Sequence, residues 1–319
     1  MGNILVTASH FQTLCQDAIK LLEHNGHRVI LNNHDMPYYS FDELAVWAPE
    51  IDGAIIGMDQ WNEAVFQLAP KLKILARFGV GVDNIDLEAA KRHGVQVVNA
   101  AGMNANAVAE LAVAMILNCL RGIPQLYQRL TAGEWARTVG RDIQGKTVGL
   151  LGFGDIGGRV ARKLSGMDVR LMAYDPYPKR EKAQSLGVVL ADMDTILSQS
   201  DIVSIHMPSI PATYHVMNRE TFRRMKPGSW LINTARGALV ETEALIDAVT
   251  CGHLAGAALD VFEQEPLPLD APVLHTPGIL CTPHAGAETA ETYQSISMMT
   301  AQAVIDSLSG KTPQNWLNK

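Results

Sequence analysis

A glycine-rich turn between an apolar strand and an amphipathic helix constrains the fold of this chain most strongly. Residues 147–157 read TVGLLGFGDIG and place Gly152, Gly154 and Gly157 in the pattern G-x-G-x-x-G. The first glycine allows a tight turn, the second lets a phosphate approach the backbone, and the third lets helix and strand pack closely. A pyrophosphate would then lie at the helix N-terminus, where backbone N–H groups have no partner. The segment predicts a dinucleotide-binding α/β domain.

An acidic residue follows this turn at the expected distance. Asp175 ends the next predicted strand, 18 residues after Gly157. Its carboxylate can accept both ribose hydroxyls of NAD and would repel the 2′-phosphate of NADP, so we expect NAD as the cofactor. The alternative is a glycine turn that only starts a structural helix, with Asp175 opening a proline-rich turn. Context and spacing together favour the dinucleotide interpretation.

Apolar runs bounded by turn residues alternate with helical patterns along the chain. The first third predicts strands at Ile4–Ala8, Arg28–Leu31, Gly53–Met58, Lys73–Phe78 and Gln96–Ala100, with helices at Asp17–Glu23, Phe41–Trp47, Asn62–Leu68 and Asp86–His93. A second series predicts strands at Thr147–Gly152, Val169–Asp175, Ile202–Met207, Trp230–Thr234, Gly256–Val261 and Ile279–Pro283, with helices at Ile156–Leu164, Arg180–Ser185, Met193–Gln199, Arg219–Met225 and Glu241–Val249. This alternation is typical of parallel sheets with helices on both faces. We therefore predict an α/β fold with two doubly wound parallel sheets.

Two long helices stand outside these series. Asn104–Leu120 is apolar on all sides, which predicts a helix buried between domains or subunits, and Pro124 should end or kink it. The last helix, from about Glu288 to Leu308, begins after the second series closes.

Composition limits the class of protein. With 319 residues, 47% hydrophobic and 18% charged, the chain has material for two cores and is not mainly disordered. A net charge of −7 gives no electrostatic basis for binding nucleic acid or an anionic membrane. The longest apolar stretch, Val108–Leu120, is too short to span a membrane and contains Glu110. The four cysteines are scattered, which favours free thiols in the cytoplasm over disulfides or a metal site.

Three titratable side chains follow three predicted strands of the second series. Arg236 follows one strand, Glu265 lies beyond Asp260 after the next, and His284 follows the last. Ligands of open α/β sheets bind beyond the carboxyl ends of the strands. There an Arg can grip the oxygens of an oxo-acid, a His can exchange the alcohol proton, and a carboxylate can orient the imidazole. Taken singly, each could be an ordinary surface charge or turn residue, and only the joint placement favours a site.

A glycine-containing turn in the first series is a further candidate. Arg77-Phe78-Gly79-Val80-Gly81 follows a predicted strand. Free N–H groups of Gly79, Val80 and Gly81 could form a nest for a carboxylate. The alternative is a turn that glycine merely permits.

Together, these motifs resemble those of the NAD-dependent D-2-hydroxyacid dehydrogenases. Within that family they resemble the phosphoglycerate dehydrogenase-like branch most. The resemblance covers about residues 70–290, whereas the first 60 residues match only in pattern. It is carried by RFGVGVDNIDLEAA, AVAELAVAMIL, GKTVGLLGFGDIGGRVA, DIVSIHMP, MKPGSWLINTARGALV, GAALDVFEQEPLP and CTPHAGAET.

The resemblance implies residue roles. It makes His284 the acid/base, Glu265 its partner and Arg236 the substrate-binding residue. Substrate contacts are expected at Arg77, Gly79, Val80, Gly81, Arg236 and His284. Cofactor contacts are expected at Val80, Gly152, Gly154, Asp155, Ile156, Gly157, Asp175, Met207, Thr234, Ala235, Arg236, Asp260, His284 and Gly286, and no metal is expected.

The resemblance also implies the organisation of the chain. We expect a discontinuous, flavodoxin-like substrate domain at 1–102 and 287–319, a Rossmann cofactor domain at 103–286, an active site in the cleft between them, and a homodimer that uses the helix after residue 103. The expected activity is hydride transfer between NAD(H) and C2 of a small 2-hydroxy or 2-oxo acid.

The identity of the substrate rests on the basic residues. Two of three basic positions of phosphoglycerate-type relatives are matched, by Arg77 and Arg137, while Gly57-Met58-Asp59 replaces the third. The most favoured pair is 3-phosphoglycerate and 3-phosphohydroxypyruvate. The alternatives are a hydroxypyruvate or glyoxylate reductase, a formate dehydrogenase-type relative, and an NADH-sensing regulator without turnover.

Overall fold

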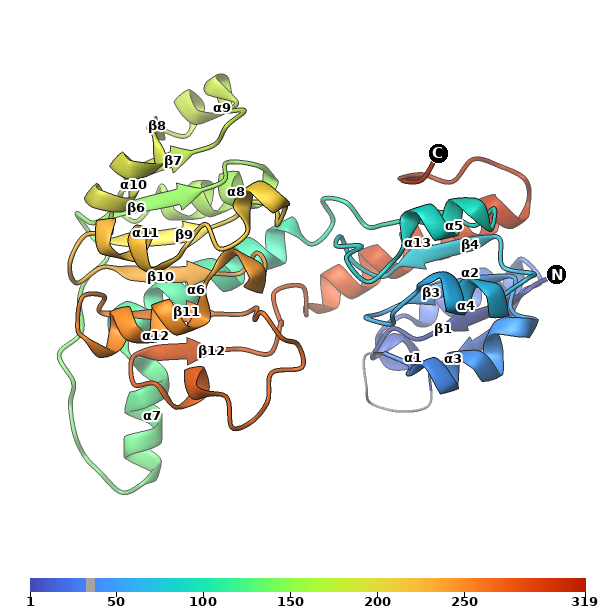
Figure 1. The fold of residues 1–319 in the computed structure, drawn as a ribbon, viewed down its shortest axis with the longest axis horizontal. Helices are drawn as coiled ribbons and strands as arrows, with labels where there is room; N and C mark the ends of the chain where they lie inside the picture. Colours follow the sequence, from blue (N-terminus) through green and yellow to red (C-terminus); the bar gives the residue numbers. More distant parts are fainter. Residues whose placement is uncertain (33–37) are drawn as a thin grey trace. The chain divides into compact units, whose positions relative to one another are not determined.

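The computed structural model describes residues 1–32 and 38–319. The chain forms two compact units, one from Met1–Asn104 with Ala287–Lys319, the other from Ala105–Gly286. The domain limits expected from the resemblance lie within two residues of these bounds. Each unit is an α/β layer structure with its own parallel sheet (Figure 1).

The first unit contains a five-stranded sheet in the order β2-β1-β3-β4-β5. All its pairs are parallel, and β1 lies between β2 and β3 in register Ile4↔Val29 and Ile4↔Gly53. The helices α1, α2 and α13 pack on one face, and α3, α4 and α5 pack on the other. The strands are Asn3–Val6 (β1), Arg28–Leu31 (β2), Gly53–Ile56 (β3), Ile74–Arg77 (β4) and Gln96–Val98 (β5). The helices are Phe11–Leu14 (α1), Gln16–His24 (α2), Phe41–Trp47 (α3), Glu63–Leu68 (α4), Leu87–Arg92 (α5) and Ala290–Leu308 (α13).

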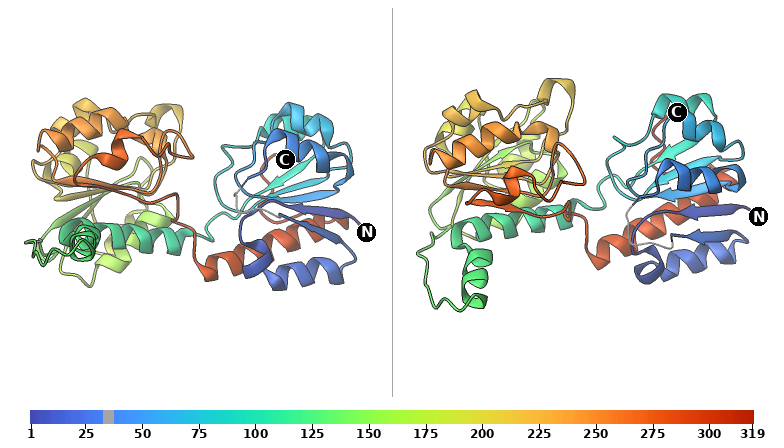
Figure 2. Two further views of the ribbon diagram at one scale, coloured as in Figure 1. Left: turned by 90° about the horizontal axis from the view of Figure 1, so that it is seen from below. Right: turned by 60° about the horizontal axis from the view of Figure 1, so that its bottom comes forward.

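The second unit contains a seven-stranded parallel sheet in the order β12-β11-β10-β9-β6-β7-β8. Helices cover both of its faces, with α6, α8 and α9 on one and α10, α11 and α12 on the other (Figure 2). The strands are Thr147–Leu151 (β6), Arg170–Tyr174 (β7), Val189–Leu190 (β8), Ile202–Ile205 (β9), Trp230–Asn233 (β10), Gly256–Leu259 (β11) and Ile279–Cys281 (β12). The helices are Ala105–Arg121 (α6), Ile123–Thr131 (α7), Asp155–Leu164 (α8), Arg180–Ser185 (α9), Met193–Gln199 (α10), Arg219–Arg224 (α11) and Thr242–Thr250 (α12). The predicted pair of doubly wound parallel sheets is confirmed.

The strand order of this sheet reverses beside β6. The chain builds β7 and β8 on one side of β6, and then returns to place β9, β10, β11 and β12 on the other. Because all pairs are parallel, the carboxyl ends of these strands lie on one edge, and the reversal of order opens a crevice there in folds of this kind. The predicted polar residues follow β10, β11 and β12 on this edge.

The long helix after residue 103 ends where glycine interrupts it. α6 stops at Arg121, Gly122 adopts a left-handed conformation (φ +60°), and Pro124 lies in the first turn of α7. α6 is largely buried, whereas α7 buries none of its side chains and extends away from its sheet (Figure 1). Pro124 therefore lies at a break, as expected, but the second helix, α7, is not among the elements predicted from the sequence.

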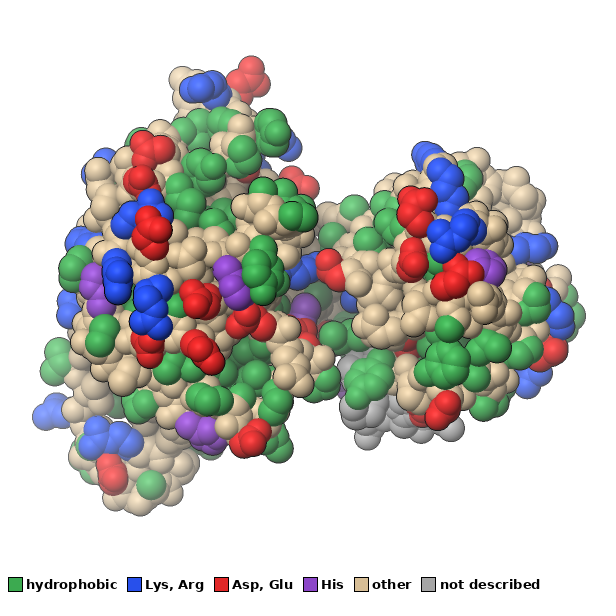
Figure 3. All heavy atoms as spheres, viewed as in Figure 1, with side chains coloured by type: hydrophobic (Ala, Val, Ile, Leu, Met, Phe, Trp, Pro, Cys, Tyr) green, Lys and Arg blue, Asp and Glu red, His purple; other side chains and the backbone are tan. Residues whose placement is uncertain are grey.

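Within residues 1–32 and 38–319, no single helix is long and apolar enough to cross a membrane, and α6 and α7 meet that test only when joined across a bend of 60°. Acidic and basic side chains are interspersed on the face of each unit drawn in Figure 3.

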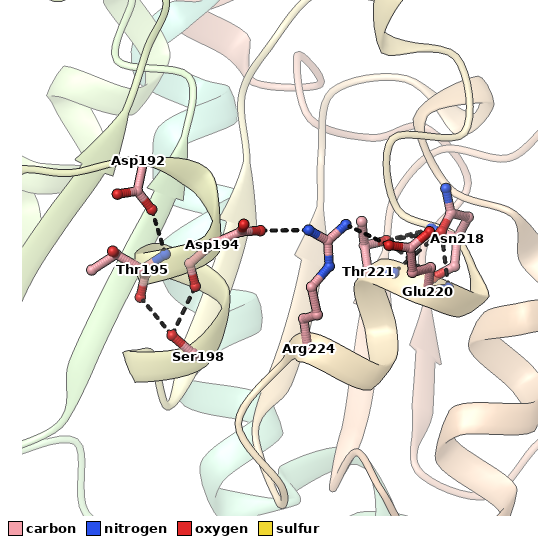
Figure 4. Close-up of polar contacts among 8 residues, drawn as sticks. All are labelled: Asp192, Asp194, Thr195, Ser198, Asn218, Glu220, Thr221 and Arg224. Atoms are coloured by element: carbon pink, nitrogen blue, oxygen red, sulfur yellow. Dashed lines mark hydrogen bonds and ion pairs between the residues drawn. The ribbon is translucent and has the colours of Figure 1, made fainter.

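Side-chain caps and one arginine fix α10 against α11 (Figure 4). Asp192 caps α10 by accepting from Thr195 N at 2.7 Å, and Asn218 caps α11. Arg224 on α11 reaches across to Asp194 on α10, at 2.5 Å. Such exposed ion pairs add little stability.

Gly149, inside β6, lies so close to neighbouring side chains that the methyl group of an alanine there should destabilise the protein. A Cβ there would lie 2.2 Å from Ser200 Oγ and 2.5 Å from Ile196 Cγ2 on the α10 side of the sheet. We expect Gly149→Ala to lower the free energy of unfolding by about 1–3 kcal/mol, as overpacked cores do. Urea unfolding measures it, with Gly166→Ala as the control because a Cβ at Gly166 meets no atom within 4 Å. Equal stability of the two variants would contradict the packing.

Candidate active site

Asn233, the last residue of β10, shapes the turn that carries Arg236. Its side chain is fully buried, accepts from Ala235 N at 3.0 Å and donates from Nδ2 to Arg236 O at 2.9 Å. The guanidinium of Arg236 donates from Nη1 to Ala235 O at 2.7 Å. Asn233 is not among the residues predicted from the sequence, although it stands at the strand end in the NTARG segment.

Gly237 brings the Arg236 turn against the turn that follows β11. A Cβ at Gly237 would lie 1.9 Å from the carbonyl carbon and oxygen of Phe262, so no side chain fits there. Phe262 N in turn donates to Glu265 Oε1 at 2.9 Å, which fixes that carboxylate. Two segments that are distant in sequence therefore meet at a glycine that pattern analysis overlooked.

His284 and Glu265 form the contact predicted from the sequence. Nδ1 of His284 lies 2.6 Å from Glu265 Oε2, and the two side chains are 42% and 18% exposed. His284 has a left-handed backbone (φ +54°), unusual for a residue with a side chain, and its N–H donates to Asp260 O at 2.8 Å. With Nδ1 directed at the carboxylate, Nε2 is left for a reacting group.

The charges around Glu265 keep it ionised. Burial would raise its pKa, but the hydrogen bond from His284 and the positive charges of His284 and Arg236 outweigh burial, so the pKa lies below its ordinary value. A carboxylate that stays charged at neutral pH can accept the Nδ1 proton of the imidazole and so orient the ring.

Asp260 holds the loop that carries His284. Its buried carboxylate accepts from Thr282 Oγ1 at 2.5 Å and from the amides of Ala285 and Gly286 at 2.8 Å each. Burial raises the pKa of Asp260 despite these bonds. The expected cofactor residues Asp260 and Gly286 therefore contact each other, and Asp260 positions the loop after β12.

The glycine-rich turn has the geometry that a pyrophosphate requires. Gly152 has φ +99°, and a Cβ there would lie 2.6 Å from the carbonyl carbon of His206. A Cβ at Gly157 would lie 2.3 Å from Gly152 O, whereas one at Gly154 would meet no atom within 4 Å. α8 begins at Asp155, and no side chain caps its N-terminus. The open space at Gly154 and the uncapped amides fit a bound phosphate.

Asp175 and two residues from neighbouring strand ends complete the expected cofactor region. Asp175 accepts from Phe153 N and Tyr177 N, each at 2.8 Å, which leaves carboxylate lone pairs for ribose hydroxyls. Met207 is nearly buried after β9, and Ile156 is half-buried in the first turn of α8. Thr234 is buried after β10, and in the described chain its Oγ1 has no hydrogen-bond partner. An orphaned hydroxyl of this kind fits a ligand contact, so these residues suit NAD.

The glycine turn of the first unit differs from the expected nest. Gly79 N donates to Arg77 O at 2.8 Å, so this amide is already used, and the expectation of three free amides is wrong for Gly79. Arg77 donates from Nη1 to Phe78 O at 2.5 Å and from Nε to Gly81 O at 3.1 Å. Asn99 holds Val80 O from Nδ2 at 2.6 Å. Arg77 therefore stabilises its own turn.

Asp59 lies buried near this turn. Its carboxylate accepts from Thr7 Oγ1 and Tyr39 N, and its carbonyl accepts from Asn84 Nδ2 at 2.6 Å. Burial raises the pKa of Asp59. This carboxyl group thus ties together the loops after β1 and β3, where relatives were expected to place a cation. Within the described part of the chain, no three His, Cys, Asp or Glu side chains form a cluster that could hold a metal.

Substitution of Gly154 and of Gly157, two glycines of the fingerprint, should cause different defects. We expect Gly154→Ala to leave the urea unfolding curve unchanged, because its Cβ meets no protein atom, yet to weaken NADH binding about 10-fold or more by blocking close approach of the phosphate. Gly157→Ala should instead destabilise the protein itself. Fluorescence titration with NADH measures binding, and normal binding by Gly154→Ala would refute the assigned phosphate position.

Comparison with known proteins agrees with this geometry. Residues 113–286 match the family model described as "D-isomer specific 2-hydroxyacid dehydrogenase, NAD binding domain". The glyoxylate reductase of Thermofilum pendens is 39% identical over 82% of this chain and 79% of that protein. The D-3-phosphoglycerate dehydrogenase of Archaeoglobus fulgidus is 36% identical over 96% of this chain and 58% of that protein.

The chain spans about half the length of the D-3-phosphoglycerate dehydrogenases that it matches. Among solved structures, the apo form of D-lactate dehydrogenase from Escherichia coli superimposes with a TM-score of 0.89 at 30% identity, covering 99% of this chain and 100% of that one. The chain therefore belongs to the D-isomer specific 2-hydroxyacid dehydrogenases, with NAD as the cofactor of its second unit.

Proposed function

We propose that the protein transfers hydride between NAD(H) and C2 of a small 2-hydroxy or 2-oxo acid. The observation that carries this proposal is the 2.6 Å contact between His284 Nδ1 and Glu265 Oε2, beside the Arg236 turn in the NAD-binding unit. A proton-transfer group and a cation at one set of strand ends are what reduction of an oxo-acid requires.

Each of the three residues has a defined role in the proposed reaction. Arg236 binds the carboxylate and carbonyl oxygens of the oxo-acid and polarises the carbonyl. His284 donates a proton from Nε2 to the carbonyl oxygen in reduction and accepts it in oxidation. Glu265 orients the imidazole and stabilises its protonated form. NADH, when bound, supplies the hydride.

The first unit supplies the proposed anchor for the substrate carboxylate. Val80 and Gly81 follow the turn that Arg77 and Asn99 hold, and their backbone N–H groups have no partner among the described residues. Two adjacent amides can bind a carboxylate oxygen. Val80 and Gly81 are therefore the proposed substrate residues of this unit, in the turn that Arg77 stabilises.

The proposed substrate pair is 3-phosphoglycerate and 3-phosphohydroxypyruvate. Its support is the similarity of most of the chain to D-3-phosphoglycerate dehydrogenases. Arg77 and Arg137 match two of the basic positions of such enzymes.

A second candidate, reduction of unphosphorylated hydroxypyruvate or glyoxylate, is favoured by the loop after β3. Gly57 offers no cation, and the neighbouring Asp59 is a buried carboxyl group. Arg77 is engaged by the carbonyls of its own turn. These features disfavour binding of a substrate phosphate at this turn. The similarity to a glyoxylate reductase also supports an unphosphorylated substrate.

We also propose a homodimer in the cytoplasm. The α7 segment exposes Ile123, Tyr127 and Leu130, and the following loop exposes Trp135 and Val139. Exposed apolar patches of this kind are typical of subunit interfaces. All four cysteines are free thiols, as expected in a reducing compartment.

Two other functions remain distinct from this proposal. An NADH-sensing regulator would bind NADH without turnover, and a formate dehydrogenase-type enzyme would give the His284–Glu265 pair no alcohol proton to handle. Steady-state turnover on a panel of 2-oxo acids and on formate separates the three.

Substitution of the histidine pair tests the catalytic roles. His284→Ala should reduce turnover by about 10²–10⁴-fold, the usual contribution of general acid–base catalysis, while NADH binding is kept. Glu265→Gln should move the alkaline loss of reductive activity to lower pH, because the imidazolium loses the negative charge beside it. pH–rate profiles with NADH and hydroxypyruvate measure both, and an unchanged profile for Glu265→Gln would exclude the pair as a catalytic unit.

A substrate comparison tests the phosphate hypothesis. If phosphate is recognised, kcat/KM should be higher for phosphohydroxypyruvate than for hydroxypyruvate, because each charge-assisted hydrogen bond contributes about 1.5–3 kcal/mol. Arg137→Ala should then remove most of that advantage. Arg77→Ala should lower kcat/KM for both substrates, because it disturbs the turn that they share. No advantage of the phosphorylated substrate in the wild type would leave the second candidate.

A further inference from the structure

Lys182 on α9 reaches the glycine-rich turn from a neighbouring helix. Its Nζ donates to Gly154 O at 2.7 Å and lies 5.2 Å from the centroid of the Phe153 ring. The end of the side chain passes over Gly158 on α8, where a Cβ would lie only 2.1 Å from both Cε and Nζ. Gly158 lies outside the three-glycine fingerprint, and its lack of a side chain leaves room for this lysine.

The surroundings of the Lys182 ammonium group are electrostatically unfavourable. It lies near the N-terminus of α8, where the helix dipole repels a cation. Burial lowers the pKa of Lys182, Asp155 opposes that effect, and the charges of Lys179 and Arg159 add to it. Within the described chain no carboxylate forms an ion pair with Lys182, and its hydrogen-bond partner is a neutral carbonyl. An anion bound at the turn would offset the unfavourable electrostatic environment of the Lys182 ammonium group.

The turn itself indicates which anion fits. The space at Gly154 is open, the N-terminus of α8 has no side-chain cap, and Asp175 holds the adjacent Phe153 N–H. A cation at Gly154 is therefore placed beside the position that the fingerprint assigns to the dinucleotide phosphates. Violations of local electrostatic preference are commonly found at functional sites.

We propose that Lys182 is a cofactor-binding residue that forms an ion pair with a phosphate group of the adenosine half of the dinucleotide. The proposal rests on the NAD site described above and adds a residue that the glycine fingerprint and Asp175 do not include. Two sources of that phosphate are possible chemically, the pyrophosphate of NAD(H) and the 2′-phosphate of NADP(H). The lysine would exchange its bond to Gly154 O for one to the phosphate.

Calorimetric binding of ADP-ribose, which carries the pyrophosphate without the nicotinamide, tests the proposal. Lys182→Met should weaken ADP-ribose and NADH about 10-fold or more, because a charge-assisted hydrogen bond is lost. Adenosine, which has no phosphate, should bind equally to both proteins. Arg159→Met is the matched control, since Arg159 is a nearby exposed cation on α8, and it should change the Kd less than about 3-fold by screened charge alone.

Lys182→Gln separates charge from a purely structural role. Glutamine can donate a hydrogen bond to Gly154 O but carries no charge. If the charge binds phosphate, Lys182→Gln should resemble Lys182→Met, and the Kd for ADP-ribose should depend less steeply on salt than in the wild type. Normal binding of ADP-ribose, NADH and NADPH by Lys182→Gln would overturn the proposal and assign the lysine to holding the turn.

The remaining outcomes identify the phosphate or reject the residue. A loss confined to NADPH, with ADP-ribose unchanged, would support Lys182 as a ligand of the 2′-phosphate. Unchanged binding of ADP-ribose, NADH and NADPH by Lys182→Met would overturn the proposal while leaving the dehydrogenase function intact. Absence of NADH binding by the wild type would instead contradict the proposed function itself.

Discussion

The close approach of two turns at Gly237 is the constraint on which the candidate active site depends. Any side chain at this position would collide with the carbonyl group of Phe262, 1.9 Å from its Cβ. With the turns in contact, the positive charge of Arg236 reaches Glu265, and Phe262 N fixes the Glu265 carboxylate. That carboxylate then meets the imidazole of His284. Three side chains that follow three different strands thus lie close together because the backbones of two turns are in contact.

The carboxyl groups of Asp260 and Glu265 have pKa values shifted in opposite directions. Asp260 is fully buried and hydrogen-bonded to neutral donors, and burial raises its pKa, so its main contribution is to hold the His284 loop in a left-handed conformation. Glu265 is less buried and faces two cations, and its pKa is lowered. The same side-chain chemistry therefore serves loop positioning at one residue and charge stabilisation at the other, as local environment dictates.

The local sequence pattern was sufficient to predict both sheets and the polar residues that follow their strands. The strand Trp230–Asn233 and the helix Ala105–Arg121 lie within one residue of the predicted bounds, because long apolar runs carry strong periodicity. The helix after Gly122 was not predicted, although its apolar residues Ile123, Leu126, Tyr127 and Leu130 recur at helical spacing. The sequence pattern also did not reveal the roles of Gly237 and Asn99, or the hydrogen bond that the Gly79 amide makes. Their roles arise from contacts with particular backbone atoms, which hydrophobic periodicity does not encode. Lys182 was missed for the same reason, since its partner Gly154 lies in the glycine-rich turn, 28 residues away in sequence.

The position of the protons on the His284 ring reports directly on its orientation by Glu265. In ¹⁵N NMR of histidine-labelled protein, with the His284 signals assigned by comparison with His284→Asn, we expect Nδ1 to carry a proton because Glu265 accepts it. Nε2 should gain and lose the titrating proton, since it is the nitrogen left for substrate. A neutral ring with its proton on Nε2 and none on Nδ1 would contradict the orientation by Glu265 on which the proposed catalysis rests.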